Sequence, residues 1–177
     1  MFHFADAAML PLLGMMFARR RPQDASLFMS ACIITTQVVI ALIAAQIGRG
    51  AERWGRKPML PIGFGALPLH GVLYTFTRNP YLLVTIQILD GIGAGVFGVV
   101  SILVIADVTK GAGRFNAAQG LVSTAVGIGA SVSTAAAGYV VQRFGFSTGF
   151  LFLAIVAFGA FVLLACALAE TKRDDAG

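Results

Sequence analysis

The chain has 177 residues, of which 58% are hydrophobic and 12% are charged. Because an ordinary soluble domain is about 25% charged, this composition argues against a soluble enzyme. The net charge of +5 does not indicate a nucleic-acid-binding protein, since the basic residues are scattered between apolar stretches rather than gathered on a soluble face. Both cysteines lie within apolar stretches and are interpreted as packing residues.

Six apolar stretches follow one another along the chain, each close to the length of about 20 residues that a helix needs to cross a bilayer. The alternation of apolar and polar residues that a membrane β-barrel requires is absent. We therefore predict an all-α membrane protein, in which residues 170–177 form a cytoplasmic tail and the transmembrane helices cover about residues 1–18, 27–48, 59–77, 82–107, 116–141 and 148–169.

Orientation is predicted from the Lys and Arg residues of alternate connections. One side carries Arg49, Arg53, Arg56, Lys57, Lys110, Arg114, Lys172 and Arg173, and the other carries Arg19, Arg20, Arg21, Arg78 and Arg143. The more basic side is expected to be cytoplasmic, together with both termini, in the cell membrane. The cluster at Arg19–Arg21 disagrees with this assignment.

The connection between the second and third stretches carries a distinctive pattern, Gly48-Arg49-Gly50-Ala51-Glu52-Arg53-Trp54-Gly55-Arg56-Lys57. In spacing and position it resembles the motif that the major facilitator superfamily of transporters carries between its second and third helices and, more weakly, between its eighth and ninth. Glu52 stands where that family more often has Asp. The resemblance implies a gate, in which the motif residues contact an acidic residue at the inner end of the fourth span. These residues would be Gly48, Glu52, Arg53, Gly55, Arg56 and Lys57, with Asp107 as the partner. The alternative is that the basic residues only fix topology.

Members of this family have about twelve spans in two six-helix repeats, whereas six are predicted here. The chain opens directly on an apolar stretch and closes on a polar tail, and it resembles the C-terminal half. A second six-helix half is therefore expected, as a separate chain, as a missing N-terminal half or as a second copy in a homodimer.

Asp90 is the most distinctive polar residue within a span, because charged groups are costly in hydrocarbon. Gln87 lies three residues earlier and shares its helix face. By resemblance, this helix lines the central cavity, where Asp90 would bind a cation, take part in proton coupling or contact substrate. The alternative is a buried Asp that neighbouring helices satisfy.

Four further polar residues lie within spans. His3 and Asp6 share a face of the first span and form a candidate proton-responsive pair, unless their place at the start of the chain exposes them to water. Gln37 is a candidate for hydrogen bonds to substrate, and bonding between helices explains it equally well. His70 is expected to have a structural role.

Small residues recur four apart, at Gly91 and Gly95 and at Gly127 and Ser131. This spacing lets helix backbones approach closely, either in static packing or in surfaces that slide during transport.

The sequence thus favours secondary active transport of a small molecule or ion by alternating access, within a lipid bilayer. A non-transporting interaction subunit or an inactive fragment is the alternative. A membrane enzyme is not favoured, because no serine nucleophile motif accompanies His3 or His70. We expect no catalytic residue, no cofactor, no metal and no nucleic-acid partner.

Overall fold

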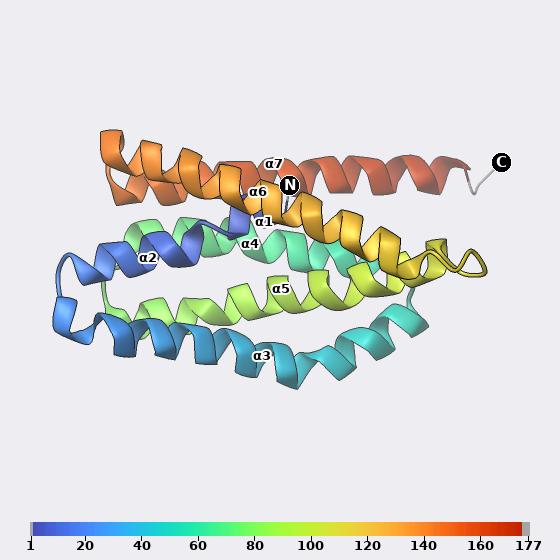
Figure 1. The fold of residues 1–177 in the computed structure, drawn as a ribbon, viewed down its shortest axis with the longest axis horizontal. Helices are drawn as coiled ribbons and strands as arrows, with labels where there is room; N and C mark the ends of the chain where they lie inside the picture. Colours follow the sequence, from blue (N-terminus) through green and yellow to red (C-terminus); the bar gives the residue numbers. More distant parts are fainter. Residues whose placement is uncertain (1, 175–177) are drawn as a thin grey trace.

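The computed structural model describes the backbone of residues 2–174 and the side chains of residues 2–166, and all regular structure within that part is helical. This confirms the all-α prediction for the described residues. In chain order the elements are α1 (Phe2–Asp6), α2 (Met9–Ala18), η1 (Pro22–Asp24), α3 (Ala25–Arg53), η2 (Lys57–Met59), α4 (Leu60–Phe76), α5 (Pro80–Val108), α6 (Phe115–Phe144) and α7 (Phe146–Asp174) (Figure 1).

Five stretches among the described residues are long and apolar enough to cross a membrane, and they contain α3, α4, α5, α6 and α7. The first predicted span, residues 1–18, is instead divided into two shorter helices by a turn at Ala7 and Ala8. Pro11 explains the division, since it has no amide hydrogen and its ring collides with the carbonyl group four residues earlier, at Ala7. The structure therefore supports five of the six predicted spans by length and composition.

Most helices extend beyond their predicted limits. α3 continues to Arg53 rather than ending at residue 48, so Glu52 and Arg53 lie on its last turn instead of in a loop. α7 continues to Asp174, so most of the predicted tail at 170–177 prolongs the helix, and residues 175–177 lie outside the described part.

The helices pack as neighbouring pairs: α3 lies along α5, α5 packs against α4, and α4 packs against α7. In Figure 1, α3 lies at the lower edge of the bundle, and α6 runs diagonally from the upper edge, across α7, toward the end of α5. The turns that follow α2, α4 and α6 gather at one end of the bundle, which we call the Arg78 end after a residue of the α4–α5 turn. The turns that follow α3 and α5 gather at the other, the Arg56 end (Figure 1).

A close approach between α3 and α5 depends on Gly91. A Cβ atom at this position would lie 2.6 Å from the Val39 Cβ and 3.0 Å from the Thr36 carbonyl oxygen. The small-residue face predicted for this helix therefore has a packing role. The corresponding face of α6 differs, because a Cβ at Gly127 would meet no atom within 4 Å among the described residues.

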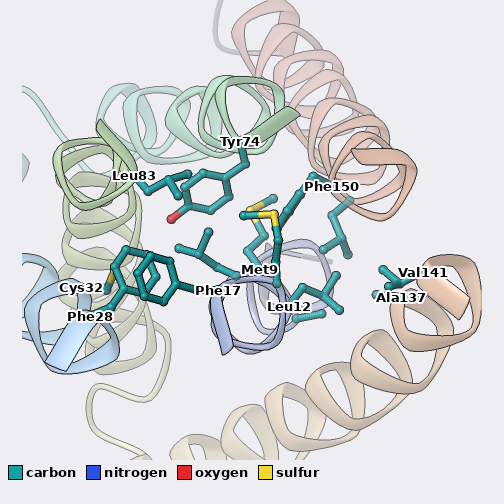
Figure 2. Close-up of a cluster of buried hydrophobic side chains, with 14 residues drawn as sticks. Met9, Leu12, Phe17, Phe28, Cys32, Tyr74, Leu83, Ala137, Val141 and Phe150 are labelled. Atoms are coloured by element: carbon teal, nitrogen blue, oxygen red, sulfur yellow. The ribbon is translucent and has the colours of Figure 1, made fainter. Parts of the chain in front are cut away.

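The largest buried apolar cluster lies toward the Arg78 end and surrounds α2 (Figure 2). Phe17 of α2 stacks on Phe28 of α3 with ring centroids 4.0 Å apart. Tyr74 of α4 and Phe150 of α7 meet on another side of α2, with centroids 5.1 Å apart. This cluster holds the divided first segment against residues of all five longer helices, α3 to α7.

We predict that Gly91→Ala destabilises the bundle, because the added methyl group collides with α3. The cost of overpacking is about 1–3 kcal/mol, and the better helix propensity of Ala offsets roughly 1 kcal/mol of it. Gly98→Ala is the matched control on the same helix, since a Cβ at Gly98 meets no atom within 4 Å. The midpoint of thermal unfolding in detergent should fall for Gly91→Ala and hold or rise for Gly98→Ala, and equal midpoints would contradict the packing described.

Candidate functional site

A polar cluster lies in the interior of the bundle, where α1, α4 and α5 meet. It contains Asp6 of α1, His70 of α4 and Asp90 of α5, and one ligand atom from each side chain lies within 4.8 Å of the other two. His70 is 1% exposed, whereas Asp6 and Asp90 are partly buried. The imidazole is thus enclosed by the bundle, whereas the two acidic residues keep part of their surface exposed.

Other polar groups lie next to this cluster. The Thr36 hydroxyl of α3 donates a hydrogen bond of 2.9 Å to Asp90 Oδ2, across the close approach at Gly91. Gln87, one turn before Asp90, is fully buried. Neither its amide atoms nor the two ring nitrogens of His70 have a hydrogen-bond partner in the structure. The cluster therefore contains more hydrogen-bonding capacity than the protein itself satisfies.

The electrostatics of the cluster favour a positive ligand. Two ionised carboxylates less than 4.8 Å apart repel each other by roughly 3 kcal/mol or more at an effective dielectric constant near 20. A shared proton or a bound cation removes this repulsion. Two carboxylates and an imidazole are also the donor types from which proteins build metal sites, so Asp6, His70 and Asp90 are the described residues best placed to hold an ion.

The structure brings together some of the predicted site residues and separates others. Asp6 and Asp90 meet although 84 positions divide them in sequence. His3 lies outside the cluster, with its ring 4.8 Å from that of Phe97. Gln37 is exposed on α3 and makes no side-chain hydrogen bond within the described part of the chain.

His70 is the residue whose position sequence reasoning missed. It was expected to be structural on a peripheral helix, but it lies against both carboxyl groups. The available signal was its location: an ionisable residue near the middle of an apolar span is itself a functional candidate.

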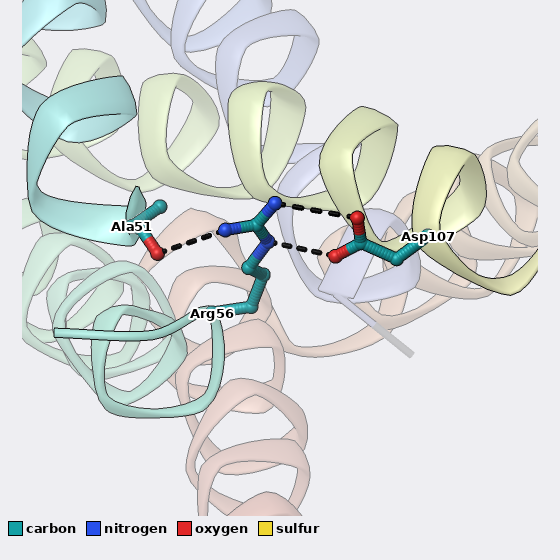
Figure 3. Close-up of polar contacts among 3 residues, drawn as sticks. All are labelled: Ala51, Arg56 and Asp107. Carbon is teal, nitrogen blue, oxygen red and sulfur yellow. Dashed lines mark hydrogen bonds and ion pairs between the residues drawn. The ribbon is translucent and has the colours of Figure 1, made fainter. Parts of the chain in front are cut away.

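The second feature is an ion pair at the Arg56 end, which we call the clasp (Figure 3). Arg56 Nε lies 2.8 Å from Asp107 Oδ2, and Arg56 Nη2 donates to Asp107 Oδ1 at 3.3 Å. Arg56 Nη1 also donates to the Ala51 carbonyl at 3.1 Å. The α3–α4 turn is thereby joined to the last turn of α5. The Arg56 and Asp107 side chains are 28% and 55% exposed, and pairs so open to solvent contribute only about 0.2–1 kcal/mol.

The other motif residues play different parts. Gly55 has φ of 93°, a conformation that favours glycine, and it turns the chain between α3 and η2. Gly48 makes no close approach, because a Cβ there would meet nothing within 4 Å. Glu52, Arg53 and Lys57 are exposed and form no ion pair with any described side chain. The contact with Asp107 thus comes from Arg56, and the gating role of the motif stays a prediction.

Comparisons with known proteins agree with the membrane-embedded fold. The family model described as Major Facilitator Superfamily matches residues 1–177. An uncharacterized MFS-type transporter of Mycobacterium tuberculosis (strain H37Rv) is 45% identical over 174 residues, which are 98% of this chain and 42% of that protein. No solved structure gives a significant match.

Two more distant relatives have names that describe drug resistance. The multi-drug resistance efflux pump PmrA of Streptococcus pneumoniae is 27% identical over 84% of this chain and 37% of its own length. The multidrug resistance protein fnx1 of Schizosaccharomyces pombe is 28% identical over 82% of this chain and 26% of its own length. The chain therefore spans less than half the length of the curated relatives it matches.

We predict that Arg56 and Asp107 are energetically coupled. In a double-mutant cycle of Arg56→Gln and Asp107→Asn, read from unfolding in detergent, the coupling should be about 0.2–1 kcal/mol, as for other exposed pairs. Lys57→Gln is the neighbouring control and should show no coupling to Asp107→Asn, since Lys57 makes no ion pair with a described side chain. If the clasp contributes nothing, the changes in the free energy of unfolding caused by the single substitutions will simply add in both cycles.

Proposed function

Because the chain belongs to the major facilitator superfamily, we propose that it forms the C-terminal half of a secondary active transporter that moves a small solute by alternating access. Membership of this family points to transport across a membrane rather than to catalysis. The partial coverage of the relatives, 42% for the Mycobacterium tuberculosis transporter, supports the assignment to a half. The motif occurs at the equivalent position of both halves, so the choice of the C-terminal half rests on the resemblance described from the sequence.

The observation that carries the proposal is the clasp between Arg56 and Asp107. Alternating access requires a contact that closes one end of the transporter and then opens. A solvent-exposed ion pair suits this task, because it holds its geometry through two bonds yet costs little to break. Its position at the very end of α5 lets it control access to Asp90, which lies near the middle of the same helix.

A second six-helix half would cover α3 and α6. In the most apolar 18-residue windows of these helices only 11% of residues are buried, against 28–39% in α4, α5 and α7. The exposed surfaces are not purely apolar: Gln37 lies on α3, and α6 exposes Gly127 and Ser131. Polar and small residues are typical of contacts between helices and of water-filled cavities, and lipid-facing surfaces favour large apolar side chains. These surfaces therefore suit a partner half and a cavity between the halves.

The proposed orientation puts the Arg56 end, where α7 also ends, in the cytoplasm, whereas α1 begins in the interior of the bundle rather than at the cytoplasmic end predicted for it. Two arginines at the opposite end make local contacts, which account for their presence there without reference to membrane topology. Arg78 Nη1 donates to the Tyr74 and Thr77 carbonyls at 3.0 and 2.9 Å, and thus caps α4. Arg19 lies 5.1 Å from the centre of the Phe146 ring.

Binding of the transported solute is assigned to the face of the bundle that includes Asp90. Asp6, Gln87 and Thr36 border it, and their carboxyl, amide and hydroxyl groups bind cations or polar solutes. The names of the two drug-resistance relatives make small organic cations a reasonable first class of probe.

We predict that Asp90→Asn abolishes gradient-driven transport by the complete assembly, because the amide keeps the size of the side chain and removes its negative charge. The measurement is efflux of ethidium, followed by fluorescence, from cells that express the wild-type or variant protein. Asp24→Asn is the matched control, since Asp24 lies in the α2–α3 connection and pairs only with Arg21 among described residues. Membrane insertion is checked in parallel by surface labelling.

Three results distinguish the alternatives. Loss of efflux in Asp90→Asn alone supports the proposed role of this face. Full efflux by a correctly inserted Asp90→Asn protein contradicts it. A wild-type protein that inserts and transports none of a broad panel of solutes would favour the interaction subunit or inactive fragment.

A further inference from the structure

The polar cluster of Asp6, His70 and Asp90 has the composition of a metal site, and we propose that it binds one divalent transition-metal cation of the Zn²⁺ class. The sequence alone led us to expect no metal, and His70 was expected to have a structural role. Its position against the two carboxyl groups changes that expectation. The proposal deepens the proposed function, since the ion would occupy the face of the bundle that the transporter uses for its cargo.

Geometry supports a single shared ion. The three donor atoms come from different helices and lie within 4.8 Å of one another. Three ligand atoms that each lie about 2.0–2.2 Å from one zinc ion are about 3.3–3.8 Å from one another. Separations of up to 4.8 Å therefore have to shorten when the ion binds.

Unpartnered polar groups point independently to a missing ligand. His70 is 1% exposed and neither of its ring nitrogens has a hydrogen-bond partner. An imidazole buried in this way loses its hydrogen bonds to water without compensation. A metal bond to one nitrogen removes this deficit. Gln87, also buried and unpartnered, lies one turn before Asp90 and offers an amide oxygen as a further ligand.

Charge favours the same conclusion. Two carboxylates and one dication form a neutral group, which is the least costly state for ions within hydrocarbon. The imidazole selects among cations, because Ca²⁺ and Mg²⁺ prefer oxygen ligands only, whereas Zn²⁺ and its neighbours accept nitrogen. Thr36 holds Asp90 in place by its hydrogen bond to Oδ2, and leaves Oδ1 free for an ion.

The two acidic residues are the more accessible members of the cluster. Asp6 and Asp90 retain partial exposure, whereas His70 is 1% exposed. A cation would therefore meet the carboxylates before the imidazole.

The test measures binding directly, without transport. The full chain is purified in lipid nanodiscs, treated with a chelator, incubated with Zn²⁺ and desalted, and its zinc content is measured by mass spectrometry. We expect one zinc per chain, and a Co²⁺-loaded sample should show the visible absorption of cobalt bound by nitrogen and oxygen. Asp90→Asn and His70→Gln should each weaken zinc binding at least tenfold.

His3→Gln is the matched control, because His3 is the other histidine of the chain and lies outside the cluster. Its zinc content should equal that of the wild-type protein. Absence of stoichiometric zinc, undiminished binding by His70→Gln, or equal losses in His70→Gln and His3→Gln would each overturn the proposal. Thermal unfolding of each metal-free variant verifies that it is folded.

This experiment separates the metal site from the transport function. Zinc binding that depends on His70 and Asp90 supports the site even if ethidium efflux fails. Efflux by a protein that binds no zinc leaves the transporter assignment intact and overturns the metal site. The two proposals can therefore fail independently.

Discussion

The absence of water in the hydrocarbon core is the constraint on which the rest of this structure depends. A charged side chain there must find partners within the protein: Asp90 accepts a hydrogen bond from Thr36, and Asp6 and His70 lie close enough to share a proton or an ion with it. Asp6, Thr36 and His70 reach the same place from α1, α3 and α4. The one strongly polar position of α5 thus organises the packing of the bundle as well as its chemistry, since each of these helices must deliver its polar residue at the correct height.

α5 is the element that links the features described. Gly91 lets α3 approach closely, and that approach brings the Thr36 hydroxyl to Asp90. The last turn of the same helix carries Asp107, which Arg56 holds through two contacts. A movement of α5 relative to α3 and the α3–α4 turn would therefore act on the cluster and on the clasp together. This connection is a physical basis for coupling between an interior site and the closure of one end.

Much of this arrangement could be predicted from the sequence, because the bilayer imposes simple rules. Confinement of charge to connections located five of the spans, and the family resemblance of the motif implied that a basic loop residue would meet Asp107. Two results needed the structure. Pro11 divides the first segment, although a proline alone does not fix whether a helix bends or breaks. The meeting of Asp6 with His70 depends on how α1 and α4 are rotated about their axes, and hydrophobic spans that are apolar on all sides carry no signal for that rotation.

The central claim is that the face of the bundle beside Asp90 opens alternately to the two sides of the membrane. The most direct measurement is labelling of a single cysteine at position 37, in a protein in which Cys32 and Cys166 are replaced by serine. A membrane-impermeant maleimide is applied from one side or the other, in sealed vesicles of the complete assembly. The account predicts reaction from both sides, with the balance moved toward the Arg56 end when Asp107 is changed to Asn. Reaction from one side only in every condition, or from neither side, would contradict it.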